Sequence, residues 1–352
     1  MIANELRKDY LLDRWVVIAT ERKRRPTDFI QKTLAEAKPE NCPFCPGNEH
    51  MTPPATLVYL MENGKVIRGK DVDGYRHKNW IVRCFPNLYP AFTPPKNGEK
   101  FEIKEQKIAE AFGHHEVIVE SPIHDEHPGK ARISQLLHVV NAILDRLKFL
   151  QERPYVKYVS IFRNHRREAG ASLSHAHSQI IATPIIPKIV ELELNASKKV
   201  WEDNSECIFC RIIRDEKESP TFIWENTHFI AFAPWASVNP FEFWIFPKKH
   251  ESSPLESGSE ERRSFAEILR LCLGSLDRLL NVPPYNFGFH IAPVGDYEFY
   301  HWHVEVYPRL AIWAGFEKST GMYINVIPPE DAAESLKKEI NSNWKKEESL
   351  DR

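Results

Sequence analysis

The stretch HAHSQIIA (residues 175–182) alternates polar and apolar side chains, and HWHVEVYP (residues 301–308) repeats this alternation in the second half of the chain. A period of two is typical of a half-buried β-strand. Successive side chains of a strand point to opposite faces, so the two histidines of each stretch are expected on one face of their strand. These two strands are therefore predicted to organise the fold.

The rest of the chain repeats in the same order around them. In each half a Cys-x-x-Cys pair is followed by two histidines that lie 51 positions apart. The two sets are Cys42, Cys45, His124 and His175, and Cys207, Cys210, His250 and His301. This agreement predicts an internal duplication. We expect a first domain over residues 1–195 and a second over 196–352, with the boundary near 195–205.

The periodicity predicts more strands than helices. Amphipathic helices are expected over residues 131–151 and 259–281, with a further helix at the C-terminus. Strands are expected at HEVIVESP (115–122), YVSIFRN (158–164), FEFWIFPKKH (241–250) and YNFGFHI (285–291). Short connections favour antiparallel pairing. The predicted fold is α+β, with an antiparallel sheet in each half and helices packed on one face.

Composition excludes several classes of protein. The 352 residues carry 47 Lys plus Arg and 49 Asp plus Glu, so bulk charge gives no support for nucleic-acid binding. No apolar run reaches the roughly 18 residues of a membrane span, and the N-terminal residues lack the pattern of a signal peptide. We expect a cytoplasmic protein without a membrane partner. Six cysteines are too few for a disulfide framework.

Each repeated set of two cysteines and two histidines suits a tetrahedral structural Zn²⁺ ion. The alternative is a redox Cys-x-x-Cys with unrelated histidines, and the repetition of the whole set counts against it. Two zinc sites are therefore predicted. Cys84 and Cys272 have no such partners and are interpreted as buried apolar residues.

His177 is left free if His175 binds metal. A neutral imidazole is a good nucleophile toward phosphorus at neutral pH. The alternatives are a second metal ligand or a hydrogen-bonded core histidine, and the residues alone leave these open.

Several motifs together carry a family resemblance. Residues 207–250 resemble the first half of a histidine-triad (HIT) domain, and SHAHSQIIA resembles the branch that reads His-x-His-x-Gln. Two HIT-like halves in a chain of this length resemble the galactose-1-phosphate uridylyltransferase family. WVVIATERKRRP, CPFCPGNE, CFPNLYPAF, ESPIH and GFEKSTGMYINVIPPEDAA extend the resemblance over nearly the whole chain.

The resemblance implies a two-step reaction. His177 would attack the α-phosphate of a UDP-sugar, sugar 1-phosphate would leave, and a hexose 1-phosphate would then accept the nucleotide from the uridylyl-histidine. It also implies a homodimer in which the C-terminal sugar loop reaches the partner's site. The site residues that it implies are Gln179, Ser172 and Asn164 at the phosphates, Arg22 and Arg25 near the nucleotide, Phe85 and Asn87 around base and ribose, and Phe316 and Glu317 at the sugar.

The second half departs from the first at two of these positions. Glu305 stands where the first half has Gln179, and His290 stands in place of Asn164. A carboxylate repels phosphate, so the second half is interpreted as structural. Some members of the family use a Glu at the position of Glu193 as a metal ligand, but the Cys-x-x-Cys pair makes a Cys₂His₂ site more natural here.

The sugar region leaves the reaction partners open. Ala311 and Ile312 replace a Lys-Phe pair of well-known uridylyltransferases. STGMYIN and GASLSHAHSQ are closer to an ADP-glucose phosphorylase, which forms the same nucleotidyl-histidine and passes it to inorganic phosphate. A third possibility is a non-catalytic, zinc-stabilised nucleotide-binding protein, since a fold alone does not give a function. The intact His177 and Gln179 favour an enzyme.

Overall fold

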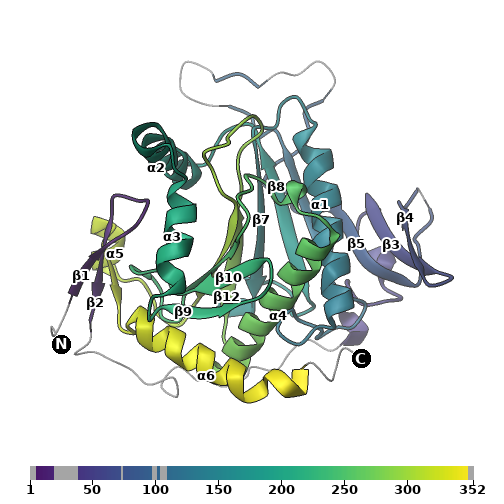
Figure 1. Ribbon diagram of the computed structural model, residues 1–352. Helices are drawn as coiled ribbons and strands as arrows, with labels where there is room; N and C mark the ends of the chain where they lie inside the picture. The colour runs from purple at the N-terminus through teal and green to yellow at the C-terminus, as the bar shows by residue number, and fades with distance from the viewer. Residues whose placement is uncertain (1–4, 20–38, 73, 97–100, 104–108, 348–352) are drawn as a thin grey trace.

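The computed structural model describes residues 5–19, 39–72, 74–96, 101–103 and 109–347. Its main element is a large antiparallel sheet (Figure 1). The strands of this sheet are β3 (Leu57–Glu62), β4 (Lys65–Gly69), β5 (Trp80–Pro86), β6 (His114–Val119), β7 (Tyr158–His165), β8 (His177–Thr183), β9 (Phe222–Glu225), β10 (Phe229–Phe232), β11 (Phe243–Pro247), β12 (Tyr285–His290) and β13 (His303–Pro308). Their spatial order is β4-β3-β5-β6-β8-β7-β12-β13-β11-β10-β9.

The two halves of the sequence meet at the pair β7–β12 and share this sheet. Phe162 lies opposite Gly288 across that pair, Gln179 lies opposite Phe162, and Glu305 lies opposite Gly288. Directly opposed residues of antiparallel strands share a face. Gln179 and its counterpart Glu305 therefore lie in one row across the sheet, with Phe162 and Gly288 between them.

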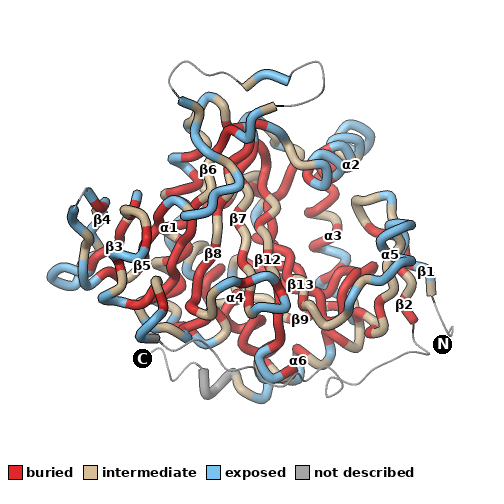
Figure 2. The backbone as a smooth tube through the Cα atoms, turned by 180° about the vertical axis from the view of Figure 1, so that it is seen from behind, coloured by how far each residue is buried: buried red, intermediate tan, exposed pale blue. Residues whose placement is uncertain are grey.

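Two long helices cover one face of the sheet, as predicted. They are α1 (Ile133–Gln151) and α4 (Ser259–Leu280), which pack on each other and on the strands behind them (Figure 1). Gly274 in α4 permits the close approach of the segment just before α1, because a Cβ on Gly274 would lie 2.6 Å from the Gly129 carbonyl oxygen. The C-terminal helix α6 (Pro329–Glu347) packs on α4. Figure 2 shows how far the central strands are buried. The predicted α+β class is confirmed.

Two further helices, which the sequence patterns did not predict, lie on the opposite face. They are α2 (Lys188–Asn204) and α3 (Ile208–Lys217). The ring of Phe209 in α3 lies 5.3 Å from that of His303 and 5.9 Å from that of Phe246, which point away from α4. Helix α2 runs through most of the predicted boundary region, where no extended linker is found. The division into two domains stays a prediction.

A small sheet joins the two N-terminal strands to a strand that precedes the C-terminal helix. Strands β1 (Glu5–Lys8) and β2 (Trp15–Ile18) are antiparallel, and β14 (Tyr323–Asn325) adds to β2 in parallel. The short helix α5 (Gly315–Thr320) packs beside β14, on the side of the molecule away from β8 (Figure 1). Among the described helices, none combines the length and apolarity that crossing a membrane requires.

Candidate functional site

His177 is the first residue of β8, and its ring nitrogens have distinct roles. Nδ1 donates a hydrogen bond to the carbonyl oxygen of His175 at 2.7 Å. The lone pair of the neutral ring is therefore on Nε2. Burial lowers the pKa of His177 and outweighs the opposing hydrogen bond to His175, and nearby Arg163 also lowers it. His177 thus presents an unprotonated nitrogen, as a nucleophile needs.

The predicted strand is shorter than expected at this end. His175 lies in the turn before β8, and His301 likewise lies before β13, so neither is a strand residue. The expectation that both histidines of each pair are strand residues is therefore wrong, although the rings of His175 and His177 both lie edge-on to Phe44. His175 Nδ1 lies beside Cys42 and Cys45.

Gln179 is held in one orientation by His115, a residue that sequence reasoning missed. The backbone N–H of Ala91 donates to His115 Nδ1 at 3.1 Å, so Nδ1 accepts and the ring N–H is on Nε2. His115 Nε2 then donates to Gln179 Oε1 at 2.7 Å. The amide NH₂ of Gln179 is left to donate to other groups. Fixed donors of this kind suit phosphoryl oxygens that gain charge during transfer.

Asn164 lies on β7, on the same face as His177 and Gln179, and is oriented from the other half of the chain. Asn286 on β12 donates through Nδ2 to Asn164 Oδ1 at 2.8 Å and to the Ala169 carbonyl at 2.7 Å. The Asn164 amide therefore keeps its NH₂ as a donor. Ser172 is exposed in the loop before His175.

A buried ion pair lies behind His177. Arg163 Nη1 donates to the His177 carbonyl at 2.9 Å and to the carboxylate of Glu120. Arg163 Nη2 donates to His127 Nδ1 at 2.8 Å, and the Ser178 hydroxyl donates to Glu120. One carboxylate and one guanidinium thus tie β6, β7 and β8 together beside His177.

Phe85 and Asn87 lie at the end of β5, near the same face. Phe85 is only 2% exposed and packs edge-on against Phe44, whose own ring lies edge-on to His177 at 5.3 Å. In this structure Phe85 is a core residue, so its contact with a base stays a prediction. The Asn87 amide nitrogen lies 3.2 Å from His115 Nε2, which places Asn87 beside the group that holds Gln179.

The first predicted metal set is assembled. Cys45 Sγ lies 3.2 Å from His124 Nδ1 and 3.4 Å from His175 Nδ1, and Cys42 Sγ lies 3.6 Å from His175 Nδ1. The Nε2 atoms point outward, to the Ser121 carbonyl at 2.8 Å for His175 and to the Ser174 hydroxyl for His124. Such outer partners fix metal-binding imidazoles with Nδ1 toward the ion. The donor set therefore fits Zn²⁺.

The second set repeats this arrangement. Cys210 Sγ lies 3.3 Å from His250 Nδ1 and 3.6 Å from His301 Nδ1, with Cys207 at the start of α3 beside them. His250 and His301 direct Nε2 to the carbonyls of Glu298 and Pro247. All six cysteines are free thiols. In both sets the two histidines therefore lie next to their Cys-x-x-Cys pair.

Glu193 belongs to a third group and not to the Cys207 set. Its carboxylate lies 2.9 Å from His290 Nδ1, with His303 and Glu305 close by, and these four residues are near enough together to hold an ion. They already bond to one another: Glu305 Oε1 lies 3.2 Å from His303 Nε2. Although burial opposes it, the carboxylates of Glu193 and Glu305 raise the pKa of His290 to about 9. The Nε2 atom of His303, which corresponds to Nε2 of His177 in the first half, is thus bonded to Glu305.

Phe316 and Glu317, predicted at the sugar, do not meet His177 within one chain. Phe316 and Glu317 lie in α5, where Glu317 Oε2 accepts the Ala314 N–H at 2.9 Å and caps the helix. Arg22 and Arg25 lie outside the described residues. Their roles stay predictions.

His115, Asn286 and the Glu120–Arg163 pair were not singled out from the sequence. Each lies in or next to a predicted strand, and alternation gives the face on which a side chain lies. The strand order and register, which bring these residues to the site, leave no local signal.

Comparisons with known proteins cover the whole chain. A model described as the galactose-1-phosphate uridyl transferase N-terminal domain matches residues 1–187, and one described as a domain of unknown function, DUF4921, matches residues 128–351. ADP-glucose phosphorylase of Arabidopsis thaliana is 33% identical over 347 residues, which are 95% of this chain and 92% of that protein. Galactose-1-phosphate uridylyltransferase of Thermotoga maritima is 31% identical over 95% of this chain and 98% of its own.

Solved structures agree with these sequence relatives. The crystal structure of the Arabidopsis thaliana ADP-glucose phosphorylase with bound ADP-glucose has a TM-score of 0.77 at 32% identity and covers 95% of this chain and 98% of its own. A uridylyltransferase structure has a TM-score of 0.73 at 26% identity and covers 96% of this chain and 99% of its own. The matching family model and the sequence relatives agree with the geometry of the site. The chain therefore belongs to the galactose-1-phosphate uridylyltransferase family of nucleotidyltransferases.

Proposed function

We propose that the protein transfers a nucleoside monophosphate from a nucleotide sugar to a phosphate acceptor through a nucleotidyl-histidine on His177. This proposal rests on two hydrogen bonds that orient the side chains of His177 and Gln179. His177 Nδ1 is occupied by a carbonyl, and Gln179 is locked by His115 with its NH₂ free. One strand therefore presents a nucleophile and, two residues on, a donor for the phosphoryl oxygens.

The first step is attack by His177 Nε2 on the α-phosphorus. The bond from this phosphorus to the bridging oxygen breaks, and the sugar 1-phosphate takes the electron pair. Gln179 and Asn164 donate to the phosphoryl oxygens, and the His175 carbonyl holds the Nδ1 proton of a ring that gains positive character. In the second step the acceptor phosphate attacks and Nε2 regains its lone pair. No proton has to reach the leaving phosphate, which suits a glutamine at position 179.

UDP-glucose with hexose 1-phosphate is the first candidate pair of substrates, as in galactose-1-phosphate uridylyltransferases. A second candidate, ADP-glucose with inorganic phosphate, is favoured by the Arabidopsis thaliana relative, whose structure contains ADP-glucose. Both share the chemistry at His177 and differ in the base and in the group that receives the nucleotide.

Zinc would be held by the two Cys₂His₂ sets and would supply structural rigidity. Four protein ligands leave no open coordination position for a substrate. The first set includes His175, whose carbonyl orients His177, so metal binding would fix the nucleophile from one side. The second would anchor α3 to the strands of the second half.

A homodimer would explain the position of the sugar loop. In one chain α5 lies away from β8 (Figure 1), so Phe316 and Glu317 would act at the partner's site. A mixture of His177→Ala and Glu317→Ala chains tests this, because it should contain dimers with one intact site.

The experiment that tests the function crosses two labelled donors with two acceptors. UDP-glucose and ADP-glucose, each labelled in the α-phosphate, are incubated with galactose 1-phosphate or inorganic phosphate. Transfer of label to an acceptor, with exchange of glucose 1-phosphate in the absence of acceptor, supports a two-step transferase. A wild-type protein that binds both donors but transfers no label would be the non-catalytic binder.

A further inference from the structure

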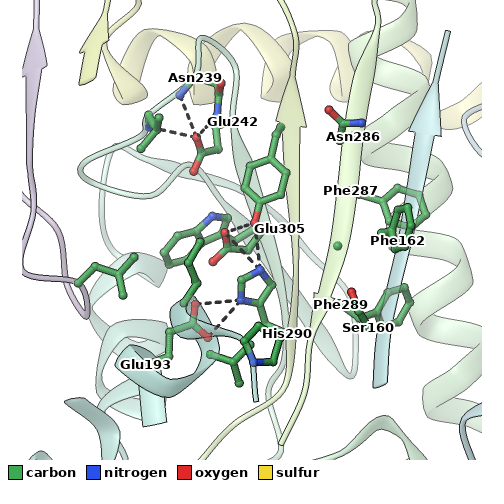
Figure 3. Close-up of a pocket in the computed structure, with 18 of the residues that line it drawn as sticks. Ser160, Phe162, Glu193, Asn239, Glu242, Asn286, Phe287, Phe289, His290 and Glu305 are labelled. Carbon is green, nitrogen blue, oxygen red and sulfur yellow. Dashed lines mark hydrogen bonds and ion pairs between the residues drawn. The ribbon is translucent and has the colours of Figure 1, made fainter. Parts of the chain in front are cut away.

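A cavity of about 490 Å³ lies on the sheet face over β7, β12 and β13, next to the catalytic site but not part of it. Its described lining includes Phe162 and Asn164, at the border with the catalytic site, but neither His177 nor Gln179. Figure 3 shows its acidic groups in two places, with Glu242 beside Asn239 in one and Glu193, His290 and Glu305 in the other, while Asn286 and Ser160 lie along the strands.

The duplication explains why this cavity exists. It lies over Glu305 and His290, which occupy in the second half the positions of Gln179 and Asn164 in the first. Glu305 lies three strands from Gln179 in the same row, a distance of roughly 14 Å at about 4.8 Å per strand. Gly288 leaves the floor open, because a Cβ placed there would meet nothing within 4 Å. The sheet face that is proposed to bind phosphate in the first half thus corresponds to the cavity in the second half.

Charges in the cavity are balanced within the protein. Asp9 and Arg14 pair at 2.9 Å, Glu193 and His290 at 2.9 Å, and Glu305 lies 3.7 Å from His290. Two further basic side chains line the cavity: Arg163 is paired with Glu120, and Arg309 lies over the ring of Trp313 at 5.3 Å. The carboxylates that face the cavity would repel a phosphate. A cationic ligand would compete with internal basic groups already in place. The balance favours an uncharged ligand.

Two buried polar groups in the wall have bonding capacity left. Trp244 is 2% exposed, and its indole N–H has no hydrogen-bond partner among the described residues. Glu242 is also buried, and its hydrogen bonds with described residues, from the backbone N–H groups of Val238 and Asn239 and from the Asn239 amide, all use Oε2. A buried donor without a partner is costly, so a ligand that accepts from Trp244 would satisfy it.

The rest of the wall combines aliphatic and aromatic side chains. Trp313 and Tyr323 lie with ring centroids 4.8 Å apart at the mouth, and Tyr307 and Phe162 line the sheet side. A ring with apolar C–H faces and hydroxyls at its edge matches such a site, since its faces pack on aromatic rings and its hydroxyls donate to carboxylates and accept from N–H groups.

We propose that this cavity is a second ligand site, separate from the nucleotidyl site, that takes an uncharged, hydroxyl-rich sugar such as one or two hexose units. Glu242 and Glu305 accept from its hydroxyls, and Trp244 donates to one of them. The site rests on the cavity and not on the proposed transferase activity, because its groups are outside the transfer reaction.

Direct binding tests it on the whole purified protein. Glucose and maltose are titrated by saturation-transfer NMR and calorimetry, with inorganic phosphate and AMP as charged probes. We expect saturable binding of at least one neutral sugar. Gly288→Val fills the floor and should weaken it at least ten-fold, whereas Gly288→Ala should weaken it less. Trp244→Phe keeps a ring but loses the donor, and should weaken it about two- to ten-fold.

His177→Ala distinguishes this site from the catalytic one. It should abolish nucleotide transfer and leave neutral-sugar binding unchanged. Loss of sugar binding in His177→Ala would place the sugar at the nucleotidyl site and overturn the proposal. No saturable binding by wild type, equal binding by folded Gly288→Val, or tighter binding of a phosphate that Gly288→Val removes would overturn it as well. Thermal melting of each variant verifies folding.

Discussion

Removing one member of the buried Glu120–Arg163 pair should be far more damaging than removing both. Their side chains are only 4% and 1% exposed, so either charge left alone would have almost no access to water. Removing one partner of a buried pair costs roughly 3–5 kcal/mol, whereas replacing both by apolar groups is often neutral or stabilising. We therefore expect Glu120→Leu or Arg163→Met to lower the unfolding free energy by about 3–5 kcal/mol, and the double variant to recover most of it.

Catalysis should not recover with stability. Arg163 also donates to the His177 carbonyl at 2.9 Å, and methionine cannot. The double variant would therefore fold with the nucleophile held less firmly. Since small misplacement of a reacting group can cost about 100-fold in rate, we expect nucleotidyl-enzyme formation to slow roughly 10- to 100-fold, with little change in donor affinity.

The assay combines urea unfolding of the two single variants and the double variant with single-turnover labelling by the nucleotide sugar. Arg163→Lys is the matched control, because it keeps the charge and one donor and should retain more of the rate than Arg163→Met. If the double variant regained both wild-type stability and wild-type labelling rate, the pair would be purely structural and the positioning argument would be refuted.

Four further outcomes follow from the structure. Metal analysis should find about two zinc ions per chain, and Cys42→Ser should lose one of them and lower the melting temperature; absence of zinc with both Cys-x-x-Cys pairs oxidised would contradict this. His115→Phe frees the Gln179 amide and should slow single-turnover labelling about ten-fold at unchanged zinc content; an unchanged rate would show that the orientation of this amide is unimportant. Burial raises the pKa of Glu242 to about 7, above the usual value near 4.3, so ionisation destabilises the fold as pH rises from about 4 to 7. Glu242→Gln should thus raise the unfolding free energy by about 3 kcal/mol at pH 8 and not at pH 4, and equal effects at both pH values would rule this out. Glu317→Ala should raise the KM for the sugar phosphate more than it slows labelling, and an equal fall in both would assign Glu317 another role.

The features that could be predicted are those with a local hydrophobic periodicity or with a copy in the other half of the chain. The strands at HAHSQIIA and HWHVEVYP and the helices α1 and α4 have strong periods, and their bounds were nearly right. The two Cys₂His₂ sets could be predicted because the whole pattern occurs twice, although no local rule brings Cys42 to His175. Helices α2 and α3 were not predicted, because α2 runs through the boundary expected near residues 195–205 and α3 contains Cys210 of the second Cys-x-x-Cys pair, which was interpreted only as a metal ligand.

The residues that orient the site side chains could not be predicted, because their contacts depend on the order and register of the β-strands. Glu120 and Arg163 lie 43 positions apart and meet only through the order β6-β8-β7. Asn286 reaches Asn164 because the two halves pair at β7–β12, which no single half encodes. The contact of Phe85 with the nucleotide base was predicted from the resemblance alone. In the structure Phe85 is buried, and Phe44, which lies between Cys42 and Cys45, packs on it.

Intact-protein and peptide mass spectrometry of wild type, after addition of a nucleotide sugar without acceptor, tests the central claim most directly. Parallel samples receive UDP-glucose or ADP-glucose, and His177→Ala is the control. The proposed mechanism predicts an adduct with the mass of UMP or AMP on the peptide that contains SHAHSQ, absent from His177→Ala and discharged by the matching acceptor. An adduct on the peptide that contains HWHVEV, or no adduct on a protein that turns over fully, would contradict it.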